Sequence, residues 1–165
     1  MLNGGGAERL ARGALAGAVA WWVMDQTLQT FYDRQSAVTR HRESEARNGV
    51  PALEVLAEEL AASAGRPLSE EERESGGTIL QWTTGIGAGV IYAVLRDQLP
   101  GSGIGRGLGY GAVYSLLVDE GLIPLLGLAP GPGAFPWQTH ARGFVGHLVF
   151  GMVAEAVLEA LETRR

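Results

Sequence analysis

Apolar stretches alternate with polar connections along this chain. Four stretches are apolar over roughly the 20 residues that a membrane-crossing helix needs: residues 13–32, 77–95, 104–128 and 143–161. The last two connections, residues 96–103 and 129–139, are short and contain Pro and Gly. The helices that they join should therefore run antiparallel. The pattern predicts an all-α fold, a four-helix transmembrane bundle that forms a single membrane domain over residues 1–165.

The first connection, residues 33–76, is long and polar and has a helical pattern of its own. Its apolar residues recur at helical spacing: Leu53, Leu56, Ala57, Leu60 and Ala61. A Gly and a Pro end this predicted amphipathic helix, which either lies on the membrane surface or is a solvated connector. Ser69 followed by Glu72 is a capping box, which predicts that the next helix starts at Glu70.

Glycine is unusually frequent, with 25 of the 165 residues. Many glycines repeat at a spacing of four, which lines one helix face with small residues and lets a neighbouring backbone approach closely. The candidate helix-packing residues are Gly13, Gly17, Gly85, Gly89, Gly103, Gly107 and Gly111. A soluble helical bundle is disfavoured, because each Gly in a water-exposed helix costs about 0.8–1 kcal/mol relative to Ala. The expected partners are the lipid bilayer and, on the glycine faces, a homo-oligomer or a membrane-complex partner.

Charge and cysteine content exclude other classes of protein. The net charge of −5 argues against a nucleic-acid partner, and the absence of Cys excludes disulfides and thiolate chemistry. Basic residues divide almost evenly between the two sides of the predicted membrane domain. The basic residues of the short connections favour a cytoplasmic N-terminus.

Ionisable residues fall inside the predicted spans, where a charge costs about 2.5–3.5 kcal/mol on insertion scales and needs a partner or a function. The candidate intramembrane polar cluster consists of Asp25, Asp119, Glu120, His147 and Glu155, with His140, Arg142 and Trp137 as supporting residues. His140, His147 and Glu155 share one face of the last span, because they are separated by close to whole numbers of helical turns.

Two interpretations of this cluster remain open. In the functional one, the side chains meet inside the bundle and relay protons or hold a divalent cation. In the structural one, which is favoured, they form interhelical hydrogen bonds and an ion pair of Arg142 with a carboxylate. Such bonds fix the register of the helices and contribute about 0.6–2 kcal/mol each. Trp137, just before the last span, is expected to be an interfacial anchor.

The chain contains no recognisable catalytic or cofactor-binding pattern. It lacks a paired nucleophile and base, a phosphate-binding loop and a complete dinucleotide fingerprint. Within the predicted spans, His and Glu do not occur at the spacing of three or four residues that helical metal sites use. We therefore expect no enzyme activity, no metal and no cofactor.

The last third of the chain carries a distinctive series of motifs. Residues 124–130 read Pro-Leu-Leu-Gly-Leu-Ala-Pro, residues 135–137 read Phe-Pro-Trp and residues 146–149 read Gly-His-Leu-Val, with Glu155 after them. This arrangement resembles the YagU-like family of bacterial inner-membrane proteins, a domain of unassigned function. The first span, which is rich in Gly and Ala and contains Met24-Asp25, extends the resemblance.

The resemblance implies a multi-pass protein of the bacterial inner membrane. It marks Trp137, His147 and Glu155 as residues that the family tends to have, and Asp119 as a position at which relatives can carry His. It implies no activity, ligand or partner, so the mechanism has to come from the residues themselves.

Two functional classes follow from the sequence. The preferred one is a structural or accessory membrane protein, such as a subunit of a larger membrane assembly. The alternative is a small ion or proton transporter or channel that uses the carboxylate–histidine cluster. A convergent cluster beside a water-accessible cavity would favour the alternative, whereas polar residues that pair off locally would favour the first class.

Overall fold

The computed structural model describes residues 4–163, which contain helices and no strands. This confirms the all-α prediction for that part of the chain. The helices in chain order are α1 (Gly4–Asp33), α2 (Ala37–Ala46), α3 (Ala52–Ser63), α4 (Glu70–Leu95), α5 (Gly103–Tyr114), the π-helical segment η2 (Ser115–Leu122), α6 (Ile123–Leu125) and α7 (Trp137–Glu162). Short 3-10 turns follow α4, as η1 (Arg96–Gln98), and precede α7, as η3 (Pro132–Ala134).

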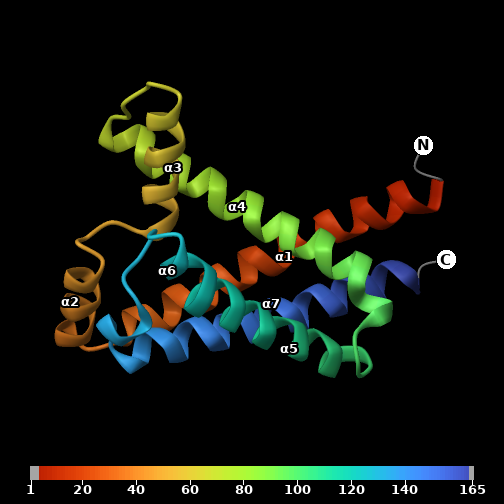
Figure 1. The fold of residues 1–165 in the computed structure, drawn as a ribbon. Coiled ribbons are helices and arrows are strands. Elements are labelled where there is room, and N and C mark those ends of the chain that lie inside the picture. Colours follow the sequence, from red (N-terminus) through yellow and green to blue (C-terminus); the bar gives the residue numbers. More distant parts are fainter. Residues whose placement is uncertain (1–3, 164–165) are drawn as a thin grey trace.

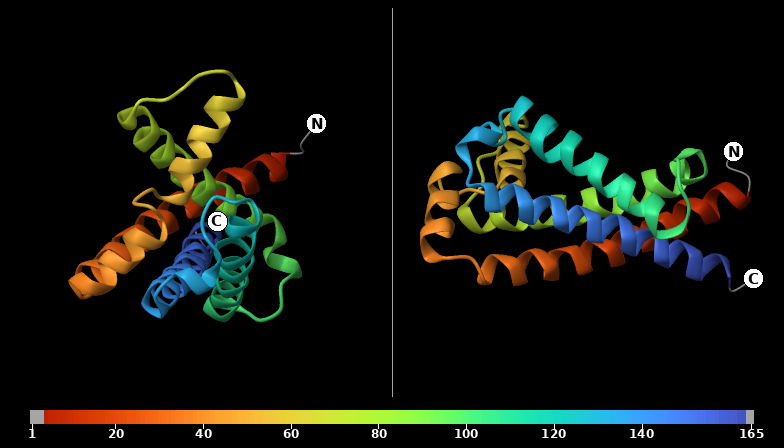
Figure 2. Two further views of the ribbon diagram at one scale, coloured as in Figure 1. Left: turned by 60° about the vertical axis from the view of Figure 1, so that its left-hand side comes forward. Right: turned by 90° about the horizontal axis from the view of Figure 1, so that it is seen from below.

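The long helices run in alternating directions, as the short connections predict (Figure 1). Helix α1 packs against α4 and α7, and α5 packs against α7. Figure 2 shows α1, α7 and α5 side by side along most of their length. Helices α2 and α3 lie at the end of the bundle opposite to the chain termini. The molecule therefore has two distinct ends, one with the long polar connection and one with both termini.

Two of the long helices have the length and composition to cross a membrane: Glu70–Gln98 and Trp137–Glu162. The other two predicted spans differ from them for separate reasons. The second half of α1 contains Asp25, Gln26 and Gln29, which lower its apolar character. Residues 104–128 are divided among α5, η2 and α6 rather than forming one continuous α-helix. The prediction of four spans is therefore not confirmed, and these findings support two of them.

The start of α4 follows from a local sequence signal. Oγ of Ser69 accepts a hydrogen bond from the backbone N–H of Glu72 at 3.2 Å, and the Glu72 carboxylate accepts one from the backbone N–H of Ser69 at 3.0 Å. This confirms the predicted capping box and the helix start at Glu70. The Ser69 hydrogen bond, together with nearby Arg66, holds the pKa of the exposed Glu72 carboxyl below its usual value.

The long first connection contains two helices rather than the single one predicted. The expected amphipathic helix is α3, and it packs against the first turns of α4. Helix α2 was not predicted, because its residues are polar and show no apolar stripe. Ser36 caps it by accepting a hydrogen bond from the backbone N–H of Thr39 at 3.1 Å.

Glycine pairs allow the long helices to approach closely. A Cβ on Gly17 of α1 would lie 2.6 Å from the carbonyl oxygen of Gly85 in α4, and one on Gly111 of α5 would lie 2.1 Å from the carbonyl oxygen of His147 in α7. Contacts this short exclude a side chain. Of the predicted helix-packing glycines, six have such contacts: Gly13, Gly17, Gly85, Gly89, Gly107 and Gly111. Gly151 of α7, which was not among the predicted residues, has them as well. Gly103 differs from them: it starts α5 with φ of +52°, and its nearest neighbour is the Glu159 side chain at 3.5 Å.

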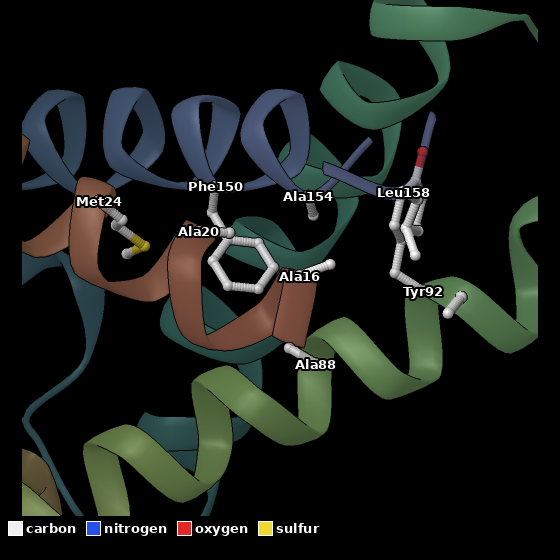
Figure 3. Packing of buried hydrophobic residues seen from close by; sticks show 9 residues of the cluster. Ala16, Ala20, Met24, Ala88, Tyr92, Phe150, Ala154 and Leu158 are labelled. Atoms are coloured by element: carbon white, nitrogen blue, oxygen red, sulfur yellow. The ribbon is translucent and has the colours of Figure 1, made fainter. Parts of the chain in front are cut away.

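The apolar core lies between α1, α4 and α7 (Figure 3). The small side chains of Ala16 and Ala20 in α1 and of Ala154 in α7 are fully buried there. They leave room for the larger side chains of Phe150 and Tyr92, which fill the space between the helices. This core is continuous with the glycine contacts and holds α7 in register with α1.

Candidate functional site

The π-helical segment η2 positions two acidic residues. Hydrogen bonds in a π-helix join residues five apart, so the turn is wider than in an α-helix, and such turns occur frequently at functional sites. Pro124 follows closely; it has no N–H for the carbonyl of Glu120, and its ring would crowd that carbonyl in a regular α-helix. The wider turn relieves this conflict and directs both Asp119 and Glu120 toward α7.

Each of the two carboxylates faces a histidine of α7. Oε1 of Glu120 lies 2.6 Å from Nδ1 of His140, and Oδ2 of Asp119 lies 3.2 Å from Nδ1 of His147. The histidines share a face of α7, because seven residues are close to two helical turns. The structure thus brings four candidate residues together as two carboxylate–histidine pairs.

Hydrogen bonds to backbone carbonyls fix where the histidines carry their protons. Nε2 of His140 lies 3.0 Å from the carbonyl oxygen of Pro132, and Nδ1 of His147 lies 2.9 Å from that of Gly143. A carbonyl only accepts, so these nitrogens donate. In His140, Nε2 therefore carries a proton, and the short contact between Nδ1 and the Glu120 carboxylate needs a second proton. The imidazole and the carboxylate share that second proton. For His147, Nε2 becomes the basic nitrogen of the ring.

A cavity of about 540 Å³ adjoins both pairs. It lies between α1 and α4 on one side and η2 and α7 on the other, and the N-terminal part of α3 forms part of its rim. Asp119, Glu120, His140 and His147 all line it. Its remaining surface is largely apolar, which is typical of a small-molecule pocket.

An aromatic ring flanks each histidine. The ring of Tyr114 stacks on His147 with centroids 5.4 Å apart, and Phe135 meets His140 edge-on at 6.3 Å. From Tyr114 a row of rings continues through Tyr110, at 5.9 Å, to Tyr92, a further 4.7 Å away. Phenolic side chains thus follow the interior from the cavity toward the other end of the bundle.

A second polar group at this end was not identified from the sequence. Glu43 of α2 is 2% exposed and pairs with Arg47, and its Oε1 also accepts from Arg142 of α7 at 2.6 Å. Its Oε2 accepts from Oγ1 of Thr139 at 2.9 Å. Burial, together with nearby Arg142, lowers the pKa of the Arg47 guanidinium. The carboxylate partner of Arg142 is therefore Glu43, whose position in a polar connection gave no sign of burial.

Glu155 belongs to a separate site near the chain termini. It is fully buried, and Arg96 donates to it twice, at 2.8 and 3.1 Å. Tyr92 donates its hydroxyl proton at 2.5 Å, and Arg106 lies 3.6 Å away. His147 and Glu155 are eight positions apart in sequence, which corresponds to about 12 Å along a helix. The structure therefore does not bring Glu155 together with His147, although both lie on one face of α7.

Two further candidate residues lie on the surface. Asp25 is exposed on α1 and contacts the neighbouring Gln26 amide at 3.3 Å, so it is not part of the convergent group. The side chain of Trp137 is exposed in the first turn of α7. Within residues 4–163, no group of three or more His, Asp or Glu side chains is arranged to hold a metal ion.

Comparison with known proteins places this site inside a recognised sequence family. The model of a family described as "Protein of unknown function (DUF1440)" matches residues 50–156, which is more than half of the chain. The matched region includes η2 and both histidines of the pairs. No curated protein and no solved structure matches the chain significantly.

Proposed function

Because this chain belongs to the DUF1440 family of proteins of unknown function, its activity has to be inferred from its own site, and we propose that it is a small membrane protein that carries protons. The supporting observation is that the Asp119–His147 and Glu120–His140 pairs line one cavity. Histidine is the side chain whose charge ordinarily changes between about pH 5 and 8. Each pair can therefore take up and release a proton without rearranging a helix.

The proposal places the protein in the bacterial inner membrane as a multi-pass protein with a cytoplasmic N-terminus. The length and composition of α4 and α7 support this arrangement. Exposed apolar side chains on the other two helical segments, such as Trp22 on α1 and Val113 on α5, would contact lipid. The motif resemblance to the YagU-like family of inner-membrane proteins supports the same placement.

The interior offers polar groups beyond the cavity. The row of Tyr114, Tyr110 and Tyr92 leads from His147 toward Glu155. Ionisable groups inside membrane helices commonly line proton pathways. We propose that protons enter at the two carboxylate–histidine pairs, with no catalytic step and no metal or cofactor.

A structural or accessory role in a larger membrane assembly is the second candidate. The observation that favours it is an open small-residue face on α5: Gly105 and Gly109 are four residues apart and have nothing within 4 Å of an added Cβ. Such a face suits a neighbouring helix, from a second copy or another subunit. The other glycine pairs are already occupied within the chain.

Proton flux into liposomes tests the proposed function. The full chain is reconstituted into vesicles that contain a pH-sensitive dye, with the membrane potential clamped by potassium and valinomycin, and an external pH step is applied. We expect wild-type vesicles to acidify faster than protein-free ones, and His147→Ala and Asp119→Asn each to reduce that excess rate at least tenfold.

Asp25→Asn is the matched control, because it removes a carboxylate on α1 that lies outside the pairs. It should keep the wild-type rate. A wild-type rate equal to that of protein-free vesicles would overturn the proposal and leave the accessory role. Equal rates in all four proteins would show that the flux does not depend on the pairs.

A further inference from the structure

The cavity contains more than the two carboxylate–histidine pairs. Its wall includes the aromatic side chains of Trp21, Tyr114, Phe135 and Phe150, contributed by four different parts of the chain. Its volume of about 540 Å³ falls within the range of roughly 300–1,000 Å³ found for small-molecule pockets. A proton alone requires neither this space nor an aromatic wall.

The charges around the cavity are unevenly balanced. Arg47 and Arg142 both pair with the buried Glu43, so the two guanidinium groups are already engaged by a carboxylate. Asp119 and Glu120 have histidines as their ion-pair partners. Once the Glu120–His140 pair has released its shared proton and His147 is neutral, three carboxylates face two guanidinium groups, and the cavity carries one negative charge. With both histidines protonated, the sign of that charge reverses.

Aromatic rings beside carboxylates match one class of ligand. An organic cation gains a coulombic interaction with the carboxylates and a cation–π interaction with the rings, and its apolar groups fit an apolar wall. An anion would have to displace Glu43 from two arginines. A hydrated metal ion would lack ligands, since the described residues hold no suitable cluster.

We propose that the cavity binds a lipophilic monovalent organic cation, held by Asp119 and Glu120 and enclosed by the aromatic wall. The proposal rests on the proposed proton-carrying function, because the cation and the protons compete for the same two carboxylates. When the cation occupies the carboxylates, the pairs release their protons. When the pairs are protonated, the carboxylates are already compensated and the cation is released.

The pH response of this site depends on all the ionisable groups that surround it. From η2 and α5 these are Asp119, Glu120 and Tyr114; from α7, His140, Arg142 and His147; and from α2 and its C-terminal cap, Glu43 and Arg47. Helices α1 and α4 contribute uncharged side chains to the wall, among them Trp21 and Gln81. Among the types of side chain in this set, histidine is the one that can change its charge near neutral pH.

Two ions of the same shape and opposite charge provide the test. Equilibrium binding of radiolabelled tetraphenylphosphonium and of tetraphenylborate is measured on the purified full chain in detergent. We expect saturable binding of the cation at pH 8, at least tenfold weaker binding at pH 5.5, and no saturable binding of the anion. Asp119→Asn with Glu120→Gln should weaken cation binding at least tenfold, whereas Asp25→Asn should leave it unchanged.

A second measurement uses the wild-type protein and so does not depend on the folding of a variant. A hydrophobic carbodiimide labels accessible carboxyl groups, and mass spectrometry gives the extent of labelling at Asp119 and Glu120. The phosphonium ion should slow labelling at both residues, and the borate ion should not. Equal protection by the two ions, or tighter binding of the borate, overturns the proposal.

The two hypotheses can fail independently. Proton flux without saturable phosphonium binding would retain the proton-carrying function and remove the organic-cation site. Saturable, pH-dependent phosphonium binding without proton flux would remove the proposed function and retain the organic-cation site, which leaves a ligand-binding membrane protein.

Discussion

The bundle places paired carboxylates at both of its ends but gives them different bases as partners. At the terminal end, Glu155 pairs with Arg96 in a two-bond contact from which solvent is excluded. At the cavity end, Asp119 and Glu120 pair with histidines beside a cavity. A guanidinium group stays charged at any ordinary pH, whereas an imidazole does not. The partner of the carboxylate therefore has a fixed charge at the terminal end and a charge that can change at the cavity end.

The comparison also shows why residues on one face of α7 have different roles. His147 and Glu155 are two turns apart, but their neighbours come from different helices. Glu155 meets the C-terminal end of α4, which supplies Tyr92, and the following turn, which supplies Arg96. His147 meets η2, which supplies a carboxylate in place of a cation. The partner, rather than the residue, determines whether an ionisable side chain is structural.

The largest effect on stability should come from removing the Arg96–Glu155 ion pair at the terminal end. Arg96→Ala leaves the carboxylate of Glu155 buried without its main cation, which typically costs about 3–5 kcal/mol. Unfolding in detergent micelles would measure the loss. Arg9→Ala is the matched control, because Arg9 pairs with Asp97 at the surface of the same end, and it should cost less than about 1 kcal/mol. A similar loss in both variants would contradict the distinction.

Next in size is a change that distorts the cavity end without removing a polar group. A Cβ on Gly111 would lie 2.1 Å from the carbonyl oxygen of His147, so Gly111→Ala should push α5 away from α7 at a cost of about 1–3 kcal/mol. Gly109→Ala, two residues earlier on the open face, should be neutral or stabilise by up to about 1 kcal/mol. Thermal unfolding of the two variants side by side measures both changes: Gly111→Ala should lower the unfolding temperature, and Gly109→Ala should not.

Removing a carboxylate of the cavity end should affect stability much less than breaking the Glu155 site. The side chain of Asp119 is 37% exposed, and its partner is a histidine, so we expect Asp119→Asn to cost less than about 1 kcal/mol. Proton flux should fall in the same variant, as described above. A stability loss as large as that of Arg96→Ala would mean that both ends are structural.

The smallest effect concerns a carboxylate that is exposed to solvent. The capping contacts hold the pKa of Glu72 below its usual 4.5. Its contribution to stability is therefore present above pH 4.5 and is lost as the pH falls through the lower pKa of the folded state. Glu72→Gln should flatten this acid-side dependence, measured as amide exchange in the first turn of α4. An unchanged pH profile would show that the capping box does not respond to protonation.

Much of the fold could be predicted from local signals. Ser69 and Glu72 specify the start of α4 through hydrogen bonds between neighbours in sequence, and the apolar spacing predicts that α3 is a helix and that it buries Ala57. The glycine spacing likewise anticipated close contacts, because a helix face is defined within one segment. Each of these features depends on residues a few positions apart.

The features that could not be predicted from the sequence depend on contacts between distant segments. Glu43 resembles any solvated acidic residue in a polar connection, and its burial arises from Arg142, which is 99 residues away. The π segment follows from a conflict between Pro124 and an α-helical turn, which the apolar pattern of residues 104–128 conceals. Asp25 and Glu155 were grouped with the cavity residues because polarity inside a span does not reveal which helix supplies the partner.

The contact between Glu43 and Arg142 has a consequence for how the protein is made. Glu43 leaves the ribosome well before its partner, and the 99 residues from Ser44 to Arg142 take roughly 5–20 s to synthesise. During that interval α2 has no docking site, and its acidic residue must stay in water or be held by another protein. Its docking therefore marks the completion of the chain's assembly, since it requires α7 to be in place.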